Sequence, residues 1–327
     1  MSNLDPAPPE LACAPSPGAS VEVLHPREVP LGGPRAIRVR RTLPQRQRSL
    51  VGAWCFADHY GPHHVRESHG MAVAPHPHTG LQTISWLFSG EVEHRDSNGV
   101  HALVHPGELN LMTAGAGICH SEVSTHNTTV LHGVQLWVAL PDADRDTARR
   151  FDNYLPQPVS ANGATLRVFL GELAGGRSPV RTFTPLLGAQ IDLDAGTGIT
   201  LDLDPAYEHG VLLDRGRIEV AGARLDVGDL ACQGTGHRSV TMRNNGDEPA
   251  RALVLGGAPF DEQLVMWWNF VGRSHDEIVQ YRRLWESHDE RFGSVDGYVG
   301  SPARLPAPPL PTTPLRPRRA ASRKASQ

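Results

Sequence analysis

Two short clusters of metal-ligand side chains stand out in this chain, His76-Pro77-His78 and His120-Ser121-Glu122. Both occur where the surrounding pattern indicates a β-strand, and in a strand the side chains two positions apart point to the same face. On a helix the same spacing would turn the two groups by about 200°, because each residue advances the helix by about 100°. We therefore expect three imidazoles and one carboxylate to converge on a metal ion inside a β-barrel.

This donor set narrows the choice of metal. Imidazole nitrogens suit Fe, Ni, Cu and Zn, and histidines with one carboxylate and open positions are typical of non-haem Fe(II) oxygenases. A closed structural zinc site more often uses thiolates. Four protein ligands on an octahedral ion would leave two positions for a substrate, dioxygen or water. The donor set therefore favours Fe(II) and leaves Zn, Ni, Cu or Mn as alternatives.

The elements that must hold these clusters are predicted as short strands joined by turns. Asn98-Gly99 is a strong hairpin signal. Gly115-Ala116-Gly117 allows the backbone to bend sharply just before the second cluster. The expected strands cover residues 83–88, 91–95, 100–104, 108–112, 118–122 and 134–138. This succession predicts an all-β fold.

The second half of the chain repeats this layout. Gly90-Glu91-Val92-Glu93, followed by Gly107-Glu108-Leu109, has a counterpart in Gly216-Arg217-Ile218-Glu219, followed by Gly228-Asp229-Leu230. The offsets, 126 residues from Gly90 to Gly216 and 121 residues from Gly107 to Gly228, correspond to one small β domain. We predict two tandem barrels, an N-terminal one over residues 21–160 and a C-terminal one over residues 161–293.

One helix is well marked near the end of the second predicted domain. Ser274 and Glu277 form a capping box, and Gly293 is the expected stop. Its apolar face consists of Ile278, Tyr281, Leu284 and Trp285. Residues 1–20 and 301–327 are rich in proline and in small or basic residues, so we expect both segments to be disordered.

The composition is that of a globular protein with a real core, since 39% of the 327 residues are hydrophobic and 20% are charged. A formal charge of −4 gives no general attraction to nucleic acid or to an anionic membrane. We expect neither a membrane span nor a signal peptide, because no apolar stretch of the required length occurs. The cysteines lack CxxC spacing, which favours a location in the reducing cytoplasm. They are Cys13, Cys55, Cys119 and Cys232. We also expect the protein to be a monomer.

Three segments together resemble the pirin family of bicupins: residues 75–80 (PHPHTG), 90–97 (GEVEHRDS) and 112–122 (MTAGAGICHSE). Upstream, residues 40–44 and 58–62 fit the opening segment of the same family. The resemblance covers about residues 25–290 and is weaker in the second half. It implies two cupin barrels, the first of which binds one iron ion. The family's metal ligands match His76, His78, His120 and Glu122.

The resemblance also implies an activity. Some pirins oxidise the flavonol quercetin, so we expect an Fe(II)-dependent dioxygenase of the quercetin 2,3-dioxygenase type, acting on a small aromatic, flavonol-like substrate and dioxygen. In that chemistry Glu122 would be the catalytic group that accepts the proton of the substrate hydroxyl. Other pirins act as cofactors of transcription regulators or modulate metabolic enzymes. The alternative is therefore a non-enzymatic, iron-dependent regulatory protein with a protein partner.

Several residues near the clusters allow more than one interpretation. Many cupins have a glutamate where this chain has Gln82, which could hydrogen-bond to a bound ligand or pack as a wall residue. Trp86 could line the cavity mouth or be an ordinary core residue. Cys119 alternates with His120, so we expect it to face away from the metal as a buried thiol.

Other histidines in the first half of the chain are predicted to have no direct part in metal binding. We expect His94 and Arg95 to lie in a hairpin near solvent. Four histidines upstream of the first cluster are predicted to lie in loops with surface or packing roles, although one of them could orient a ligand. They are His59, His63, His64 and His69.

The second barrel is expected to lack a metal. Counting back from Gly216, the two histidine positions are occupied by Asp202 and Asp204, and Glu208 matches Gln82. In the return half, His237 is followed two residues later by Ser239 instead of a carboxylate. A second metal site would then require that the fold brings His209 and His237 together.

Overall fold

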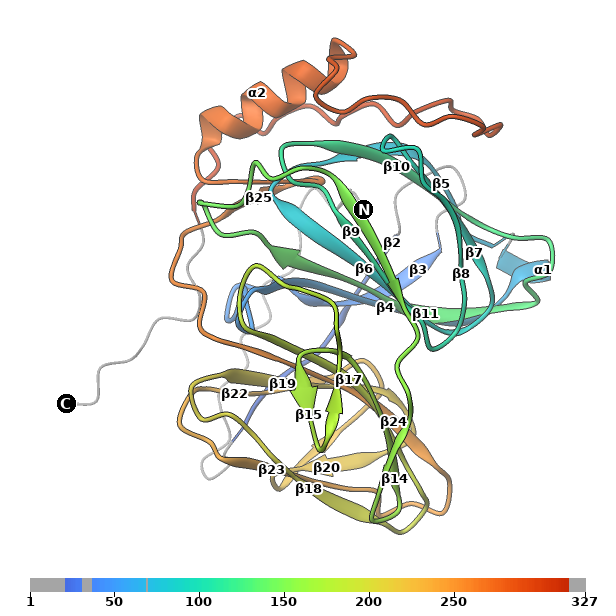
Figure 1. The fold of residues 1–327 in the computed structure, drawn as a ribbon, viewed down its shortest axis with the longest axis vertical. Helices are drawn as coiled ribbons and strands as arrows, with labels where there is room; N and C mark the ends of the chain where they lie inside the picture. Colours follow the sequence, from blue (N-terminus) through green and yellow to red (C-terminus); the bar gives the residue numbers. More distant parts are fainter. Residues whose placement is uncertain (1–20, 31–36, 69, 318–327) are drawn as a thin grey trace.

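The computed structural model describes residues 21–30, 37–68 and 70–317. It contains two β-barrels, each of which combines a seven-stranded sheet with a four-stranded sheet. Figure 1 shows the barrels stacked along the long axis of the molecule. The C-terminal helix lies on the side of the first barrel that faces away from the second (Figure 1). The predicted all-β fold with two tandem barrels is confirmed.

The N-terminal barrel carries both ligand clusters on its smaller sheet. In spatial order this sheet consists of β5 (Ala72–His78), β10 (Ile118–Ser124), β7 (Val92–Asp96) and β8 (His101–Val104). The larger sheet consists of β12 (Arg150–Tyr154), β9 (Leu109–Thr113), β6 (Leu81–Ser89), β11 (Val130–Ala139), β4 (Trp54–His64), β3 (Arg38–Leu43) and β2 (Arg27–Pro30). The short helix α1 (Val65–Ser68) connects β4 to β5. All six predicted strands are present.

The C-terminal barrel repeats this arrangement. Its smaller sheet consists of β18 (Gly198–Asp202), β23 (Ser239–Arg243), β20 (Ile218–Val220) and β21 (Ala223–Leu225). Its larger sheet consists of β1 (Glu22–Leu24), β22 (Leu230–Gln233), β19 (Glu208–Arg215), β24 (Ala250–Gly257), β17 (Leu186–Leu193), β14 (Ala164–Leu170) and β13 (Val159–Ala161). Two small hairpins accompany it, β15 (Glu172–Leu173) with β16 (Gly176–Arg177), and β25 (Val265–Trp267) with β26 (Phe270–Gly272).

The repeated glycines have the same backbone role in both barrels. Gly90 and Gly216 adopt φ values of +91° and +85°, and each lies in the turn that links the two sheets of its barrel. Gly107 and Gly228 also have positive φ values, +77° and +93°. Only glycine adopts this region without steric cost, so the repeat in the sequence reflects two pairs of equivalent turns.

The domain boundaries differ from the predicted ones. β1 pairs with β22, so residues 22–24 complete the second barrel although the sequence assigned them to the first. β13 crosses the predicted boundary at residue 160 and pairs with β14. A three-residue strand whose partner lies about 200 residues away leaves no local sequence pattern, which explains the error.

Helix α2 (His275–Glu286) begins where it was predicted. The Ser274 hydroxyl accepts a hydrogen bond from the Glu277 N–H at 3.2 Å, which caps the first turn. Ile278, Tyr281 and Trp285 are buried, as the apolar pattern indicated. The helix ends at Glu286, seven residues before the expected stop at Gly293. Within the described residues no helix is both long and apolar enough to cross a bilayer.

The C-terminal segment was predicted to be disordered from residue 301, and this is wrong for its first part. The Leu305 N–H donates to the Pro75 carbonyl on β5 at 2.8 Å, and the Trp285 indole donates to the Leu305 carbonyl at 2.9 Å. Ala307 is buried in a cluster with Phe270 and Trp285. Residues 1–20 and 318–327, which include Cys13, lie outside the described residues.

A continuous apolar layer joins the two barrels. Side chains of the two large sheets, among them Trp86 and Phe169, belong to one buried cluster, and their rings lie 4.6 Å apart. The Trp86 indole donates to the Gln190 side chain at 2.8 Å, and the Trp54 indole donates to the Gly256 carbonyl at 3.0 Å. Trp86 is therefore a core residue between the barrels.

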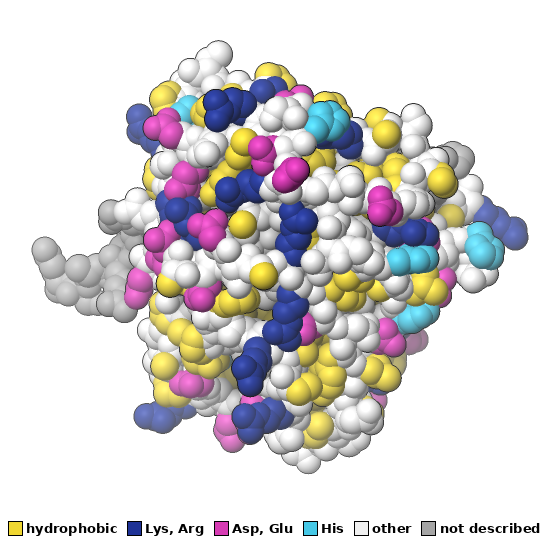
Figure 2. Space-filling model, turned by 45° about the horizontal axis from the view of Figure 1, so that its top comes forward, with side chains coloured by type: hydrophobic (Ala, Val, Ile, Leu, Met, Phe, Trp, Pro, Cys, Tyr) yellow, Lys and Arg dark blue, Asp and Glu magenta, His cyan; other side chains and the backbone are white. Residues whose placement is uncertain are grey.

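The outer surface is mixed in character on the face shown in Figure 2. A column of basic side chains crosses both halves of the molecule, with acidic side chains beside it (Figure 2). Hydrophobic side chains appear there in small, separate groups (Figure 2). This face therefore lacks the large continuous apolar patch that marks an obligate protein interface.

Candidate metal centre

Three imidazoles meet inside the N-terminal barrel. His76 and His78 lie on β5, and His120 on the neighbouring β10 is paired in register with His76. All three are almost completely buried, with 1–2% exposure. One nitrogen from each ring lies within 4.8 Å of the other two. The predicted spacing therefore does bring these three side chains to one point.

The protonation state of these imidazoles suits a cation. Burial lowers the pKa of His76 to about 3, and it also lowers the pKa values of His78 and His120. His76 Nδ1 donates to the Ala74 carbonyl at 2.9 Å, which leaves Nε2 without a proton. His78 Nε2 and His120 Nε2 face each other at 3.1 Å. Neutral imidazoles with unprotonated nitrogens are the form that binds metals.

Glu122 lies beside this triad but is not within it. A register shift separates His120 from Glu122, because β5 has one extra residue between the positions that pair with them. The Glu122 carboxylate is buried and accepts a hydrogen bond from the Ser85 hydroxyl at 3.0 Å. Burial raises its pKa. It is absent from the group of atoms within 4.8 Å of one another, so ligation would need a side-chain rotation.

Aromatic and polar side chains form the walls around the triad. The Trp137 ring lies 5.2 Å from the His78 ring and stacks on Phe56 at 4.1 Å. Tyr60 is buried, and burial together with the charge of Glu122 raises the pKa of its hydroxyl.

Gln82 belongs to the opposite face of its strand. Ser85 points toward Glu122, so alternation along β6 directs Gln82 away from the triad. Its amide donates to the Thr113 hydroxyl at 2.9 Å. Of the two interpretations, a packed wall residue is the one that fits.

The sequence placed His94 near solvent, and this is wrong. His94 on β7 is 4% exposed and is paired in register with Glu122. Its Nδ1 lies 3.4 Å from His120 Nδ1, and its Nε2 lies 3.1 Å from the Asp96 carboxylate. Arg95 alternates with it and is half-buried. The signal was present in the sequence, because His94 and Asp96 have the same two-residue spacing that identified the triad.

Three of the four upstream histidines lie in a strand and not in the loops that were predicted for them. His59, His63 and His64 all belong to β4, and His69 lies outside the described residues. His63 is half-buried and His64 is exposed, whereas His59 is completely buried. Cys119 is buried as expected, packs beside Phe270 under helix α2, and has a pKa raised to about 12 by burial.

A second buried cluster joins the two barrels and was not predicted. His59 and His132, both from the N-terminal barrel, contact Asp214 of β19 with N···O distances of 2.7 and 2.6 Å. The two imidazole Nε2 atoms lie 3.4 Å apart. Sequence reasoning missed this cluster because Asp214 is 155 positions from His59 and comes from the other barrel.

This interdomain cluster is arranged for hydrogen bonds and not for a metal. The Arg40 guanidinium donates to His59 Nδ1 at 3.0 Å, so the ring proton is on Nε2, the atom that faces Asp214. Arg251 also donates to the Asp214 carboxylate at 2.6 Å. Two guanidinium groups beside the cluster repel a divalent cation. Burial raises the pKa of Asp214, but the hydrogen bonds from His132 and His59 and the charge of Arg251 outweigh it and hold that pKa below its usual range.

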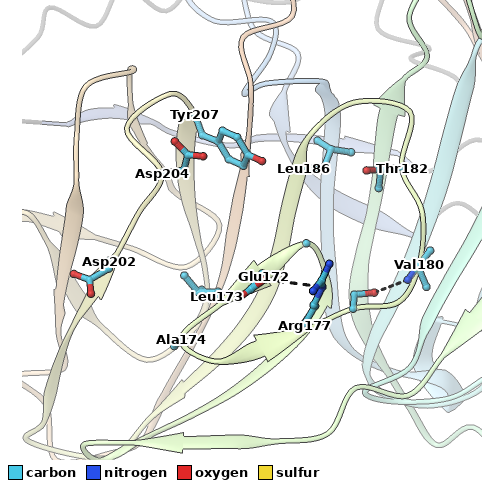
Figure 3. A pocket seen from close by; sticks show the side chains of 12 residues that line it. Glu172, Leu173, Ala174, Arg177, Val180, Thr182, Leu186, Asp202, Asp204 and Tyr207 are labelled. Carbon is cyan, nitrogen blue, oxygen red and sulfur yellow. Dashed lines mark hydrogen bonds and ion pairs between the residues drawn. The ribbon is translucent and has the colours of Figure 1, made fainter.

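The C-terminal barrel has an apolar interior. Leu201, Leu203 and Met242 belong to its buried core, whereas the alternating Asp202 and Asp204 are exposed. Both carboxylates line an open pocket of about 540 Å³ together with Glu172, Arg177 and Tyr207 (Figure 3). His209 is buried with both ring nitrogens unpartnered, and burial lowers its pKa to about 4. Ser239 is exposed on β23.

The fold and the site define the class: this chain is a bicupin whose first barrel has a histidine-lined centre. The pirin family profile matches residues 36–138, and the profile of the pirin C-terminal cupin domain matches residues 188–293. The chain belongs to the pirin family.

Individual relatives agree with this assignment. A Pseudomonas aeruginosa protein, provisionally named a quercetin 2,3-dioxygenase, is 44% identical over 286 residues, covering 87% of this chain and 89% of that protein. Human pirin is 29% identical over 214 residues, covering 63% and 73% of the two chains. The crystal structure of a quercetin 2,3-dioxygenase from Acinetobacter baumannii is similar at a TM-score of 0.85 and 37% identity, covering 92% of this chain and 98% of that one.

Proposed function

We propose that this pirin binds one Fe(II) ion through His76, His78, His120 and Glu122. The observation that carries the proposal is the triad itself: three buried imidazoles with lowered pKa values, each of which offers one nitrogen within 4.8 Å of the other two. His78 Nε2 and His120 Nε2 lie 3.1 Å apart and share at most one proton, which a cation would displace. Histidines with one carboxylate favour Fe(II), although Zn, Ni, Cu and Mn can use the same donors.

Glu122 has two roles in this proposal. Rotation away from Ser85 brings its carboxylate to the ion as the fourth ligand. Its buried carboxylate beside the triad is also the acceptor for the proton of a substrate hydroxyl.

We further propose that the activity is that of a quercetin 2,3-dioxygenase, on a small aromatic, flavonol-like substrate and dioxygen. The names of the Pseudomonas and Acinetobacter relatives support the reaction. Trp137 beside His78 supports an aromatic substrate. Bound Fe(II) would supply a Lewis acid for the substrate oxygen and a centre for dioxygen. The protein would orient the ring, exclude water and hold the released proton on Glu122.

A second candidate is a non-enzymatic, iron-dependent regulatory protein with a protein partner. The burial of the triad favours this reading, since a flavonol needs an open path to the ion. For either function we place the protein in the cytoplasm, because Cys55, Cys119 and Cys232 are free thiols.

Anaerobic reconstitution with Fe(II), followed by an oxygen-consumption assay with quercetin, distinguishes the two candidates. If the protein is the dioxygenase, it consumes oxygen only when iron is bound, and His76→Gln abolishes iron binding and oxygen consumption. His209→Gln is the matched control, because His209 is another buried histidine outside the triad. Tight iron binding without oxygen consumption would reject the dioxygenase and support the regulator.

A further inference from the structure

His94 and Asp96 continue a chain of contacts that starts at His120. His120 Nδ1 lies 3.4 Å from His94 Nδ1, and His94 Nε2 lies 3.1 Å from an Asp96 carboxylate oxygen. The Asp96 side chain is fully buried and the His94 side chain is 5% exposed. Neither residue belongs to the four proposed ligands.

The backbone fixes the direction of these hydrogen bonds. The N–H groups of Asn98 and Val100 donate to Asp96 Oδ1 at 2.8 and 3.1 Å, so this carboxylate is an acceptor. Its Oδ2 likewise accepts, so the donor in this contact is His94 Nε2–H. With the ring proton on Nε2, His94 Nδ1 is the acceptor for His120 Nδ1–H. His120 Nε2 is left without a proton, facing His78.

We propose that His94 and Asp96 form a positioning pair that fixes the tautomer of His120 and strengthens it as a metal ligand. This inference rests on the proposed iron site. A partner that accepts the outer N–H of a ligating histidine orients the ring and raises its basicity, and loss of such a partner costs 10–100-fold in metal affinity.

His76 is the other triad residue whose outer ring nitrogen has a hydrogen-bond partner, and that partner is uncharged. His76 donates to the neutral carbonyl of Ala74. His120 is backed by a carboxylate through His94, so it is the more electron-donating ligand. The pair therefore also lowers the reduction potential of the bound ion, because greater donation stabilises the ferric state.

Asp96→Asn tests the relay without deleting a side chain. The Asn98 and Val100 N–H groups still require an acceptor, so the asparagine oxygen stays with them and its NH₂ group turns to His94 Nε2. His94 Nε2 must then accept a hydrogen bond, so the ring proton of His94 moves to Nδ1. There it faces the Nδ1–H of His120, and the hydrogen bond between the two rings is lost. We expect the dissociation constants for Fe(II) and Co(II) to rise about 10–100-fold. The iron potential should become more positive, and the visible spectrum of bound Co(II) should change.

Two further variants separate positioning from folding. His94→Leu removes the acceptor and should behave as Asp96→Asn does. His94→Gln supplies a carbonyl for His120 and an amide for Asp96, so it should restore most of the affinity. Asp229→Asn is the matched control, since Asp229 also binds a histidine, His25, and a backbone N–H in the other barrel. It should leave metal affinity and potential unchanged.

The outcomes are distinct. Wild-type affinity, potential and Co(II) spectrum in Asp96→Asn and His94→Leu would overturn the inference and leave the iron site standing. A wild-type protein that takes up neither Fe(II) nor Co(II) would overturn the proposed function and this inference with it. A fall in affinity that His94→Gln does not reverse, or that Asp229→Asn shares, would show a general loss of folding and also reject the pair.

Discussion

At the scale of single residues, the important property of the site is that its imidazoles are uncharged. Burial disfavours the imidazolium form, so the folded protein resists protonation of His76 at pH values where the unfolded chain accepts a proton. The three imidazoles therefore remain in their metal-binding form throughout the neutral range. Because the folded protein disfavours their protonation, the free energy of unfolding of the metal-free protein depends on pH.

The metal-free protein should lose stability on acidification. A histidine whose folded pKa lies below its unfolded value near 6.5 binds more protons when unfolded, so stability falls as pH decreases from about 6.5 toward the folded value of about 3. Each such histidine contributes about 1.4 kcal/mol per pH unit in that window. Urea unfolding at pH 7.5, 6 and 5 measures the slope. His76→Gln should reduce it, and an unchanged slope would contradict the assigned burial effect.

Metal binding should stabilise the wild-type protein and not the triad variants. A ligand that binds only the folded state at 100 times its dissociation constant adds about 2.7 kcal/mol. Thermal unfolding with and without Fe(II), under anaerobic conditions, should show a higher midpoint for wild type and for His209→Gln. His78→Gln should show no shift. A shift of wild-type size in His78→Gln would argue against its role as a ligand.

At the scale of elements, the turn before β10 sets where His120 lies. Gly115 has φ +53°, and a Cβ there would lie 1.9 Å from the Thr147 carbonyl oxygen. Gly99 in the β7–β8 turn also has positive φ, but a Cβ there meets nothing within 4 Å. A substitution at Gly99 therefore introduces backbone strain alone, whereas a substitution at Gly115 adds a steric collision.

Gly115→Ala should be much more damaging than Gly99→Ala. The left-handed backbone alone costs about 1–2 kcal/mol for a residue with a Cβ, and Gly99→Ala should cost no more. Gly115→Ala adds the collision with Thr147, so it should cost several kcal/mol and weaken Fe(II) binding. Urea unfolding and iron titration of both variants test this. Equal losses would show that the close approach at Gly115 is unimportant.

The elements also show which features a sequence can predict. The strands around the triad follow from alternation and turn residues, and His76, His78 and His120 follow from two-residue spacing. The C-terminal segment does not, because its contacts come from irregular backbone: Arg304 lies over the Trp285 ring at 3.6 Å, the Leu305 N–H donates to β5, and the Ala307 N–H donates to Glu286. A proline-rich segment without regular secondary structure has no periodicity to detect. His94 carried a signal that was assigned to a solvent-exposed hairpin instead.

Arg304→Ala tests whether this segment is held as described. Loss of the guanidinium removes a cation–π contact of about 0.5–2 kcal/mol with the Trp285 ring and a hydrogen bond to the Trp285 carbonyl. Residues 302–317 should then be cleaved faster in limited proteolysis, while the barrels remain intact. Arg316→Ala, in an exposed part of the same segment, is the control. Equal cleavage rates in wild type and Arg304→Ala would contradict the docked arrangement.

At the scale of the whole molecule, the two barrels share one buried junction. Besides the apolar layer, the carboxylate of Asp214 binds His59 and His132 across the junction. This arrangement depends on a fold that places strands from two halves of the chain face to face. Sequence spacing therefore predicts each barrel but not the cluster between them.

Asp214→Asn should weaken the junction strongly. Breaking a buried charge pair by removing one partner costs about 3–5 kcal/mol, because Arg251 is left without its counter-charge. We expect lower stability in urea and a broader or two-step transition. Asp152→Asn, which removes the partner of the exposed Arg150, should cost at most about 1 kcal/mol. Equal effects of the two substitutions would argue against the junction cluster.

The central claim is that one ion is held by side chains of two adjacent strands in the first barrel. Iron content after anaerobic loading and desalting tests it most directly, in wild type, His76→Ala, His120→Ala and His209→Gln. The account predicts one iron per chain in wild type and His209→Gln, and none in His76→Ala or His120→Ala, with all four proteins folded. One iron per chain in the two alanine variants would contradict it.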